Sequence, residues 1–158
     1  MPKVLLILPC NKMAKAGDYK KGNNWRLVLK HIKPWREKGL VDLAAVDCID
    51  MLGIVPEWEN YKTIGKDEYP SWSKFKDPVK FRQLVEAISA KLLDLAPHYS
   101  HIIVYVNVRA YYEALKIALA KIRMAKVFLL KLNHFSPLAF NSNVHKVVDI
   151  LNKIFPLE

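Results

Sequence analysis

The chain has 158 residues, 52% of them apolar, and a formal net charge of +10 at pH 7. This length is typical of one domain, here residues 1–158, and this apolar fraction excludes a disordered chain. No apolar run is long enough to span a bilayer, and the N-terminus lacks a signal-peptide cleavage pattern. We therefore expect a cytoplasmic protein without membrane contact.

The positive charge is concentrated at the start of the chain. Residues 1–40 carry ten Lys or Arg and two acidic side chains, a net charge of +8, whereas residues 41–76 carry four basic and seven acidic side chains. Such a concentration is typical of an anion-binding surface, and the alternative is a solvated basic surface of the kind found in thermophiles. The many lysines and the single glutamine also indicate a hot-growing organism.

The first predicted elements are a strand and a helix. A continuous apolar run over 3–8, ended by Pro9, predicts a strand buried on both faces. Asn23 or Asn24 is expected to cap a helix, which Pro34 disturbs and Gly39 ends. The apolar face of this helix consists of Trp25, Val28, Leu29 and Ile32.

A second strand is predicted over 41–46, followed by an irregular segment over 48–76 with no clear period. A segment this long inside a compact domain is usually functional. Because apolar burial is favourable, we expect residues 56–76 to fold over the strand ends. The aromatic residues behind this expectation are Trp58, Tyr61, Tyr69 and Trp72.

The second half of the chain continues the alternation of helices and strands. Asp77 as cap and Pro78 in the first turn open a strongly amphipathic helix that Pro97 stops. We then expect strands over 102–106 and 127–132, and helices over 111–123 and 143–155.

This alternation predicts an α/β fold, a three-layer sandwich with a mainly parallel sheet of about four strands. Ligands of such sheets bind outside the carboxyl ends of the strands. That edge corresponds to residues 9–15, 47–50, 107–112 and 131–135. The polar side chains expected there are Cys10, Asn11, Lys12, Asp47, Asp50, Asn107, Arg109, Lys131, Asn133 and His134.

The two cysteines are too few for a disulfide scaffold and form no CxxC zinc motif. Cys10 is either a nucleophile, activated by nearby lysines and a helix N-terminus, or a small buried side chain. Cys48 lies between apolar neighbours and is expected to be buried. Both cysteines follow predicted strands, so a Cys10–Cys48 disulfide is a further alternative in a thermophile.

Other motifs exclude several classes of site. The chain contains no dinucleotide fingerprint, no P-loop and no zincin motif, so we expect no cofactor and no metal. His98 and His101 are expected to be two solvent-facing histidines. His134 is either a contact to a base or phosphate, or a packing residue. Glu57 and Glu59 flank Trp58, a pattern that suits stacking and hydrogen bonding of a purine-like base. The alternative is that Trp58 is a core residue of the irregular segment.

Three short stretches carry a family resemblance: LLILPCNKMAK, MLGIVPEWENY and the later EYP. Over roughly 3–135 the chain resembles the core domain of archaeosine synthase, through a Pro-Cys pair and a Leu-Gly-x-Val-Pro segment with a downstream acidic residue. Lysine stands one position off the family spacing, the Lys-Pro-Tyr is absent, and asparagines stand where serine and histidine are expected. The matching residues are Pro9, Cys10, Leu52, Gly53, Val55, Pro56 and Glu59.

The resemblance implies a fold similar to that of uracil-DNA glycosylases and a role in archaeal tRNA, where the family modifies 7-cyano-7-deazaguanine. It implies tRNA as partner, and a partner subunit that supplies an RNA-binding module. The reacting centre would hold Cys10, Lys12, Lys15 and Glu59. The nucleic-acid contacts would come from Lys20, Lys21, Arg26, Trp58, Asn107, Asn133 and His134.

Two alternatives to an enzyme of tRNA modification stay open. One is a non-catalytic nucleic-acid-binding module, in which the basic first quarter holds phosphates and aromatic side chains stack bases. The other is a protein that binds a small nucleotide without any nucleic acid. A reactive cysteine at the strand ends favours the enzyme, whereas a basic surface without a pocket favours the module.

Overall fold

The computed structural model describes residues 2–9, 23–48, 51–57, 75–132 and 137–157. Within them five strands form one sheet in the order β3-β2-β1-β4-β5. The strands are β1 (Val4–Pro9), β2 (Val41–Asp47), β3 (Gly53–Pro56), β4 (His101–Val104) and β5 (Lys126–Leu129).

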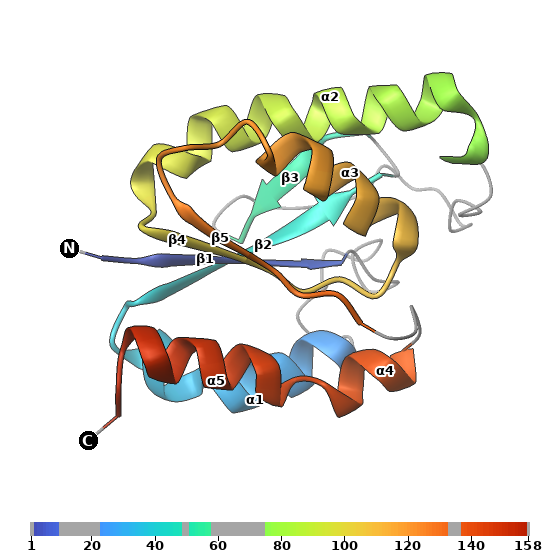
Figure 1. Cartoon of the computed structure of the whole chain (residues 1–158). Coiled ribbons are helices and arrows are strands. Elements are labelled where there is room, and N and C mark those ends of the chain that lie inside the picture. The colour runs from blue at the N-terminus through green and yellow to red at the C-terminus, as the bar shows by residue number, and fades with distance from the viewer. Residues whose placement is uncertain (1, 10–22, 49–50, 58–74, 133–136, 158) are drawn as a thin grey trace.

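Helices cover both faces of this sheet, which makes three layers (Figure 1). One face carries α2 (Pro78–Leu95) and α3 (Arg109–Leu119). The other carries α1 (Asn23–Glu37), α4 (Pro137–Ser142) and α5 (His145–Ile154). A short 3₁₀ turn, η4 (Ala96–His98), follows α2. The α/β class is therefore confirmed.

The sheet is mixed and has five described strands, where a mainly parallel sheet of about four was expected. β1 pairs in parallel with β2 and with β4, and β4 pairs in parallel with β5. β3 is a fifth strand, antiparallel to β2, and it lies inside the segment 48–76 that was expected to be irregular. Its four residues are too few to show a periodic pattern, so the pairing with β2 decides its conformation.

Each face of the sheet has its own core. β1 is buried along its whole length, as its continuous apolar run predicted. Its alternate residues Leu5 and Ile7 pack under α2 and α3, whereas Leu6 and Leu8 pack against α1 and α5. The expectation of a strand buried on both faces is confirmed.

The helix ends follow the local sequence. Asp77 caps α2 by accepting a hydrogen bond from the Val79 amide at 2.9 Å, with Pro78 as the first helical residue. After α1, Gly39 has φ +70°, and the Gly39 and Leu40 amides donate back to the carbonyls of Arg36 and Trp35. This is a Schellman ending, and it confirms that Gly39 follows the end of the helix.

Pro34 lies inside α1, which continues to Glu37. A proline removes one helical hydrogen bond, but Pro34 is exposed, and Trp35 beside it is buried. The Trp35 indole donates to the Phe155 carbonyl at 2.9 Å. Packing of this turn against the C-terminal end of α5 offsets the lost bond.

Candidate functional site at the carboxyl edge of the sheet

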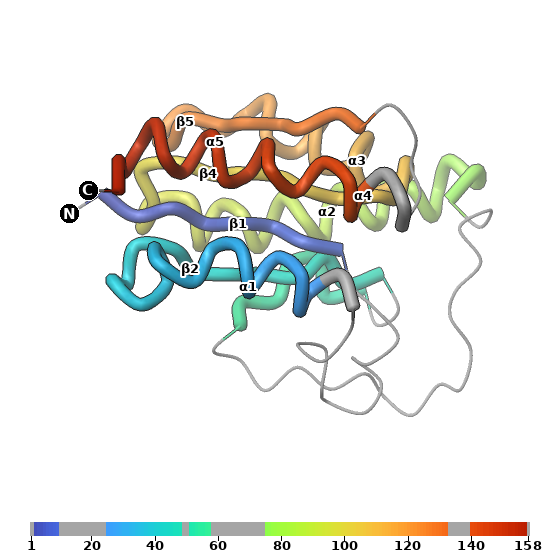
Figure 2. The backbone as a smooth tube through the Cα atoms, turned by 90° about the horizontal axis from the view of Figure 1, so that it is seen from below, coloured from blue at the N-terminus to red at the C-terminus, as the bar shows by residue number. Residues whose placement is uncertain are grey.

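The order of the strands reverses between β1 and β4. The chain leaves β1 for β2 on one side and later returns to β4 on the other side of β1. Figure 2 shows β1 between β2 and β4 from below. In open α/β sheets, ligands bind outside the carboxyl ends of the strands at such a reversal. The candidate site is therefore the edge where β1 and β4 end.

Five predicted site residues are described at this edge. Arg26 lies in the first turn of α1, Asp47 ends β2, Asn107 follows β4, Arg109 begins α3, and the exposed Lys131 follows β5. Arg26 and Arg109 are exposed and Asn107 is half-buried. Because a helix N-terminus carries partial positive charge, the starts of α1 and α3 add to the two guanidinium groups. The described part of the edge is suited to an anion such as a phosphate.

Asp47 has a structural role at this edge and is not part of its exposed surface. Its side chain is fully buried, and Oδ2 accepts a hydrogen bond from the Leu52 amide at 3.1 Å. This bond spans the reversal from β2 into the antiparallel β3. A buried carboxylate with a main-chain donor is stabilised where it stands, so Asp47 shapes the turn.

Cys48 and Tyr111 lie beneath the edge. The Cys48 Sγ is 2.6 Å from the Tyr111 hydroxyl oxygen, and both side chains are fully buried. The expectation that Cys48 is buried is confirmed. Tyr111 falls in the predicted stretch 107–112, but its partner could be found only once α3 was seen to pack on the face that holds Cys48.

Two more aromatic side chains hold the ends of β1 and β4 in place. The Trp25 indole donates to the Pro9 carbonyl at 2.9 Å, which ties the first turn of α1 to the end of β1. The Tyr105 hydroxyl donates to the Phe140 carbonyl, and the two rings are 4.3 Å apart between centroids. Burial raises the pKa of Tyr105 above its ordinary value, so the donor stays protonated.

Most of the predicted site residues fall outside the described residues. These are the four proposed for the reacting centre, Cys10, Lys12, Lys15 and Glu59, and five proposed for nucleic-acid contacts, Lys20, Lys21, Trp58, Asn133 and His134. The Cys10–Cys48 disulfide and the placement of residues 58–74 also fall outside them. Phe75, directly after that segment, is buried in the core under α2.

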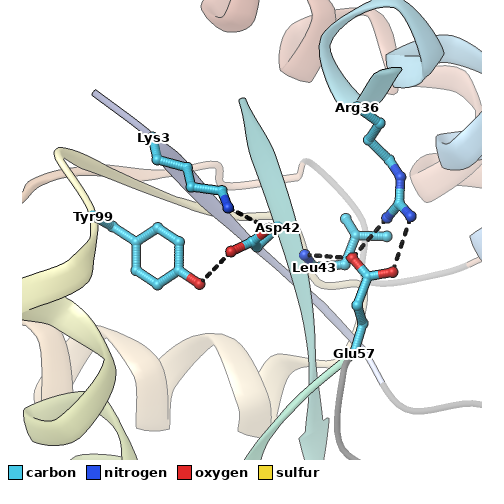
Figure 3. A network of polar contacts seen from close by, with 6 residues as sticks. All are labelled: Lys3, Arg36, Asp42, Leu43, Glu57 and Tyr99. Atoms are coloured by element: carbon cyan, nitrogen blue, oxygen red, sulfur yellow. Dashed lines mark hydrogen bonds and ion pairs between the residues drawn. The ribbon is translucent and has the colours of Figure 1, made fainter. Parts of the chain in front are cut away.

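The opposite end of the sheet carries a polar network with a structural role (Figure 3). Lys3 Nζ lies 3.1 Å from Asp42 Oδ1, and the Tyr99 hydroxyl donates to Asp42 Oδ2 at 2.7 Å. Burial, followed by the hydrogen bond to Asp42, raises the pKa of Tyr99. The network joins the chain before β1, the start of β2 and the chain before β4.

Glu57 is part of this end and not of the carboxyl edge. Its two carboxylate oxygens accept from Arg36 at 2.7 and 2.9 Å, and Oε2 also accepts from the Leu43 amide at 3.1 Å (Figure 3). A carboxylate held this way is occupied by protein donors. Antiparallel β3 carries Glu57 to the start of β2, away from the carboxyl edge. Trp58 and Glu59 of the same predicted pattern lie outside the described residues.

The two histidines differ, which corrects the expectation that both face solvent. His98 is exposed, but His101 is half-buried and stacks on Phe128 with 6.1 Å between ring centroids. Burial and then the charge of Lys126 lower the pKa of His101. No group of three His, Cys, Asp or Glu side chains suited to a metal occurs among the described residues.

Comparison with known proteins gives a likeness of fold. Neither a protein-family model nor a curated protein sequence matches this chain. The crystal structure of AF0587, a protein of unknown function, superposes with a TM-score of 0.54 at 12% sequence identity. The match covers 100% of this chain and 46% of AF0587, so the chain spans less than half of the length of that protein.

In the described part of the chain, no helix is both long and apolar enough to cross a membrane.

Proposed function

We propose that the chain binds tRNA and acts on, or holds, a 7-deazaguanine nucleotide at the carboxyl edge of its sheet, as a cytoplasmic relative of archaeosine synthase. The observation that carries this proposal is the strand reversal between β1 and β4. β1 ends there on Pro9, the first residue of the Pro-Cys motif of the resemblance. Arg26 and Arg109 lie in the first turns of α1 and α3, which cover opposite faces of the sheet.

The charge of the chain supports a polyanion as partner. Residues 10–26 follow β1 directly and contain five Lys or Arg and one acidic residue. Phosphate contacts from Lys20, Lys21 and Arg26 would position the RNA, whereas side chains that reach base edges would select the nucleotide. Asn107, Asn133, His134 and the stacking residue Trp58 have this second role in the proposal.

The proposed chemistry uses side chains from two segments. Cys10 acts as the nucleophile, Lys12 or Lys15 lowers its pKa and holds the developing charge, and Glu59 accepts hydrogen bonds from the base. A thiolate is the reactive form of cysteine, and nearby cations favour it. No cofactor is needed for these roles, and a partner subunit supplies further RNA contacts.

Salt dependence of tRNA binding tests the proposed surface. Arg26→Ala and Lys33→Ala each remove one cation from α1, but only Arg26 lies at the carboxyl edge. We expect Arg26→Ala to reduce the log–log salt slope by roughly one, and the double change Lys12→Ala and Lys15→Ala to reduce it by roughly two. Lys33→Ala should leave the slope unchanged. Equal slopes for all variants would refute the placement of the RNA at this edge.

Catalysis is tested separately. Cys10→Ala should leave the salt slope unchanged, because a neutral thiol forms no phosphate pair, while it abolishes conversion of the deazaguanine nucleotide in tRNA. Intact binding without any conversion by the unmodified protein would support the non-catalytic module. Binding of a free nucleotide but not of tRNA would support the small-nucleotide protein.

A further inference from the structure

β5 is an edge strand whose outer side has no partner among the described residues. It pairs with β4, and no described strand follows it in the sheet. Figure 2 shows β5 beyond β4, on the side of the sheet away from β2. Its residues Val127, Phe128 and Leu129 are half-buried, because helices cover the two faces of the strand but not its edge.

The hydrogen bonds to β4 show which main-chain groups face outward. The Lys126 amide donates to the Ser100 carbonyl at 3.0 Å, and the Leu130 amide donates to the Val104 carbonyl at 3.1 Å. In a parallel pair, alternate residues direct both their N–H and their C=O to the same neighbour. The N–H and C=O groups of Val127, Leu129 and Lys131 therefore point away from the sheet.

Cations stand at both ends of this edge. Lys126 and Lys131 are exposed, and they lie at the start of β5 and just beyond its end. Residues 101–132 contain six Lys or Arg and one acidic residue, Glu113, so few carboxylates of the same stretch are available to neutralise them. An extended segment that pairs with β5 would meet a positive charge at each end.

The same charges disfavour a second copy of this chain. A two-fold dimer through β5 would pair the strands antiparallel and bring Lys126 of one copy and Lys131 of the other to the same end of the pair, on opposite faces. The dimer would collect four positive charges around one strand pair, two at each end, and edge lysines are a common protection against self-association. The occupant that fits the charges is an acidic segment of another protein.

We propose that β5 is a docking edge for an extended acidic peptide, which adds to the sheet as a sixth strand. Main-chain bonds to Val127 and Leu129 give the affinity, and the two lysines select the sequence. Val127 and Leu129 pack toward one face and Phe128 toward the other, so Lys126 and Lys131 point to opposite faces. The partner therefore carries two carboxylates five residues apart, with apolar or β-branched residues between them.

The probe is the blocked peptide SEVTVTES, titrated into the labelled full chain. Its two glutamates are five residues apart and face the two lysines whether the peptide runs parallel or antiparallel to β5. We expect amide exchange to slow at Val127 and Leu129, whereas the Leu130 amide, already bonded to β4, stays as it was. The control peptide SKVTVTKS should bind roughly tenfold more weakly, since both ion pairs become repulsive.

N-methylation of the peptide separates strand addition from simple charge attraction. In both orientations the first glutamate and every second residue after it direct their N–H toward β5. The first threonine of SEVTVTES belongs to this set. Methylating its main-chain nitrogen removes a hydrogen bond to β5 and should abolish binding. Methylating the valine that follows it, whose N–H points away from β5, should change the dissociation constant by less than about threefold.

Charge reversal of the chain completes the test. The double change Lys126→Glu and Lys131→Glu, at two exposed positions, should reverse the preference so that SKVTVTKS binds more tightly than SEVTVTES. The proposal is wrong if both methylated peptides bind alike, or if neither charged peptide binds. It is also wrong if single-stranded RNA, and not the peptide, shifts the amide signals of residues 126–131.

Discussion

Gly53 begins β3 with φ +81°, in the left-handed region that favours glycine. A Cβ at this position would lie 2.4 Å from the Ala87 carbonyl oxygen in α2. We expect Gly53→Ala to lower the free energy of unfolding by about 2–5 kcal/mol, because backbone strain and overpacking add. Urea denaturation followed by circular dichroism measures this loss.

Gly39 provides the matched control. It also has a positive φ, +70°, but a Cβ there would meet nothing within 4 Å. Gly39→Ala should therefore cost only the backbone strain, about 1–2 kcal/mol. If the two substitutions cost the same, the close approach of β3 to α2 contributes nothing, and the argument for Gly53 fails.

At the scale of elements, one ion pair joins α1 to the residue after β3. Arg36 and Glu57 form two hydrogen bonds, and their side chains are 27% and 14% exposed. Hydrogen bonds between charged groups that are partly shielded from water contribute more than exposed pairs do. A double-mutant cycle with Arg36→Met and Glu57→Gln should give a coupling energy of about 1–3 kcal/mol in urea denaturation.

The exposed pair Lys33–Glu37 on the same helix is the control for this cycle. Lys33 Nζ lies 3.7 Å from Glu37 Oε1, and the two side chains are 73% and 65% exposed. A cycle at this pair should give about 0.3–0.5 kcal/mol, and 1 M salt should reduce it further. Equal coupling at the two pairs would show that the bidentate geometry and burial of Arg36 and Glu57 have no energetic effect.

At the scale of the whole molecule, the described residues form two cores that share one sheet, so we expect the two cores to unfold together. Leu6→Ala removes side-chain volume on the face of α1 and α5, and Ile7→Ala on the face of α2 and α3. Each should lower the free energy of unfolding by about 2–5 kcal/mol. In Ile7→Ala, the indole signals of Trp25 and Trp35, on the opposite face, should lose intensity at the same urea concentration as the circular dichroism signal.

Separate midpoints for the two signals would contradict the joint unfolding of the two cores. The control is Leu93→Ala, because Leu93 is 61% exposed on α2. It should change the free energy of unfolding by less than about 0.5 kcal/mol, as surface substitutions usually do.

The sequence by itself determined the α/β class, four of the five described strands and the main helices, because long amphipathic helices have a strong periodic pattern and buried strands a continuous apolar run. The four-residue β3 and the short α4 have no such pattern. The predicted strands 102–106 and 127–132 also end earlier in the structure, at Val104 and Leu129, because strand ends depend on pairing.

Only the tertiary structure decided which side chains meet. Strand order is set by packing between distant segments, which local sequence does not specify. The tertiary structure placed the reversal between β1 and β4 and brought Arg26 and Arg109 to one edge of the sheet. It also separated Glu57 from that edge, because an antiparallel strand carries its end to the opposite side of the sheet. Local sequence determines secondary-structure propensity and helix capping. It does not determine contacts such as that of Cys48 with Tyr111, because these residues are 63 positions apart and meet only when the helices pack on the sheet.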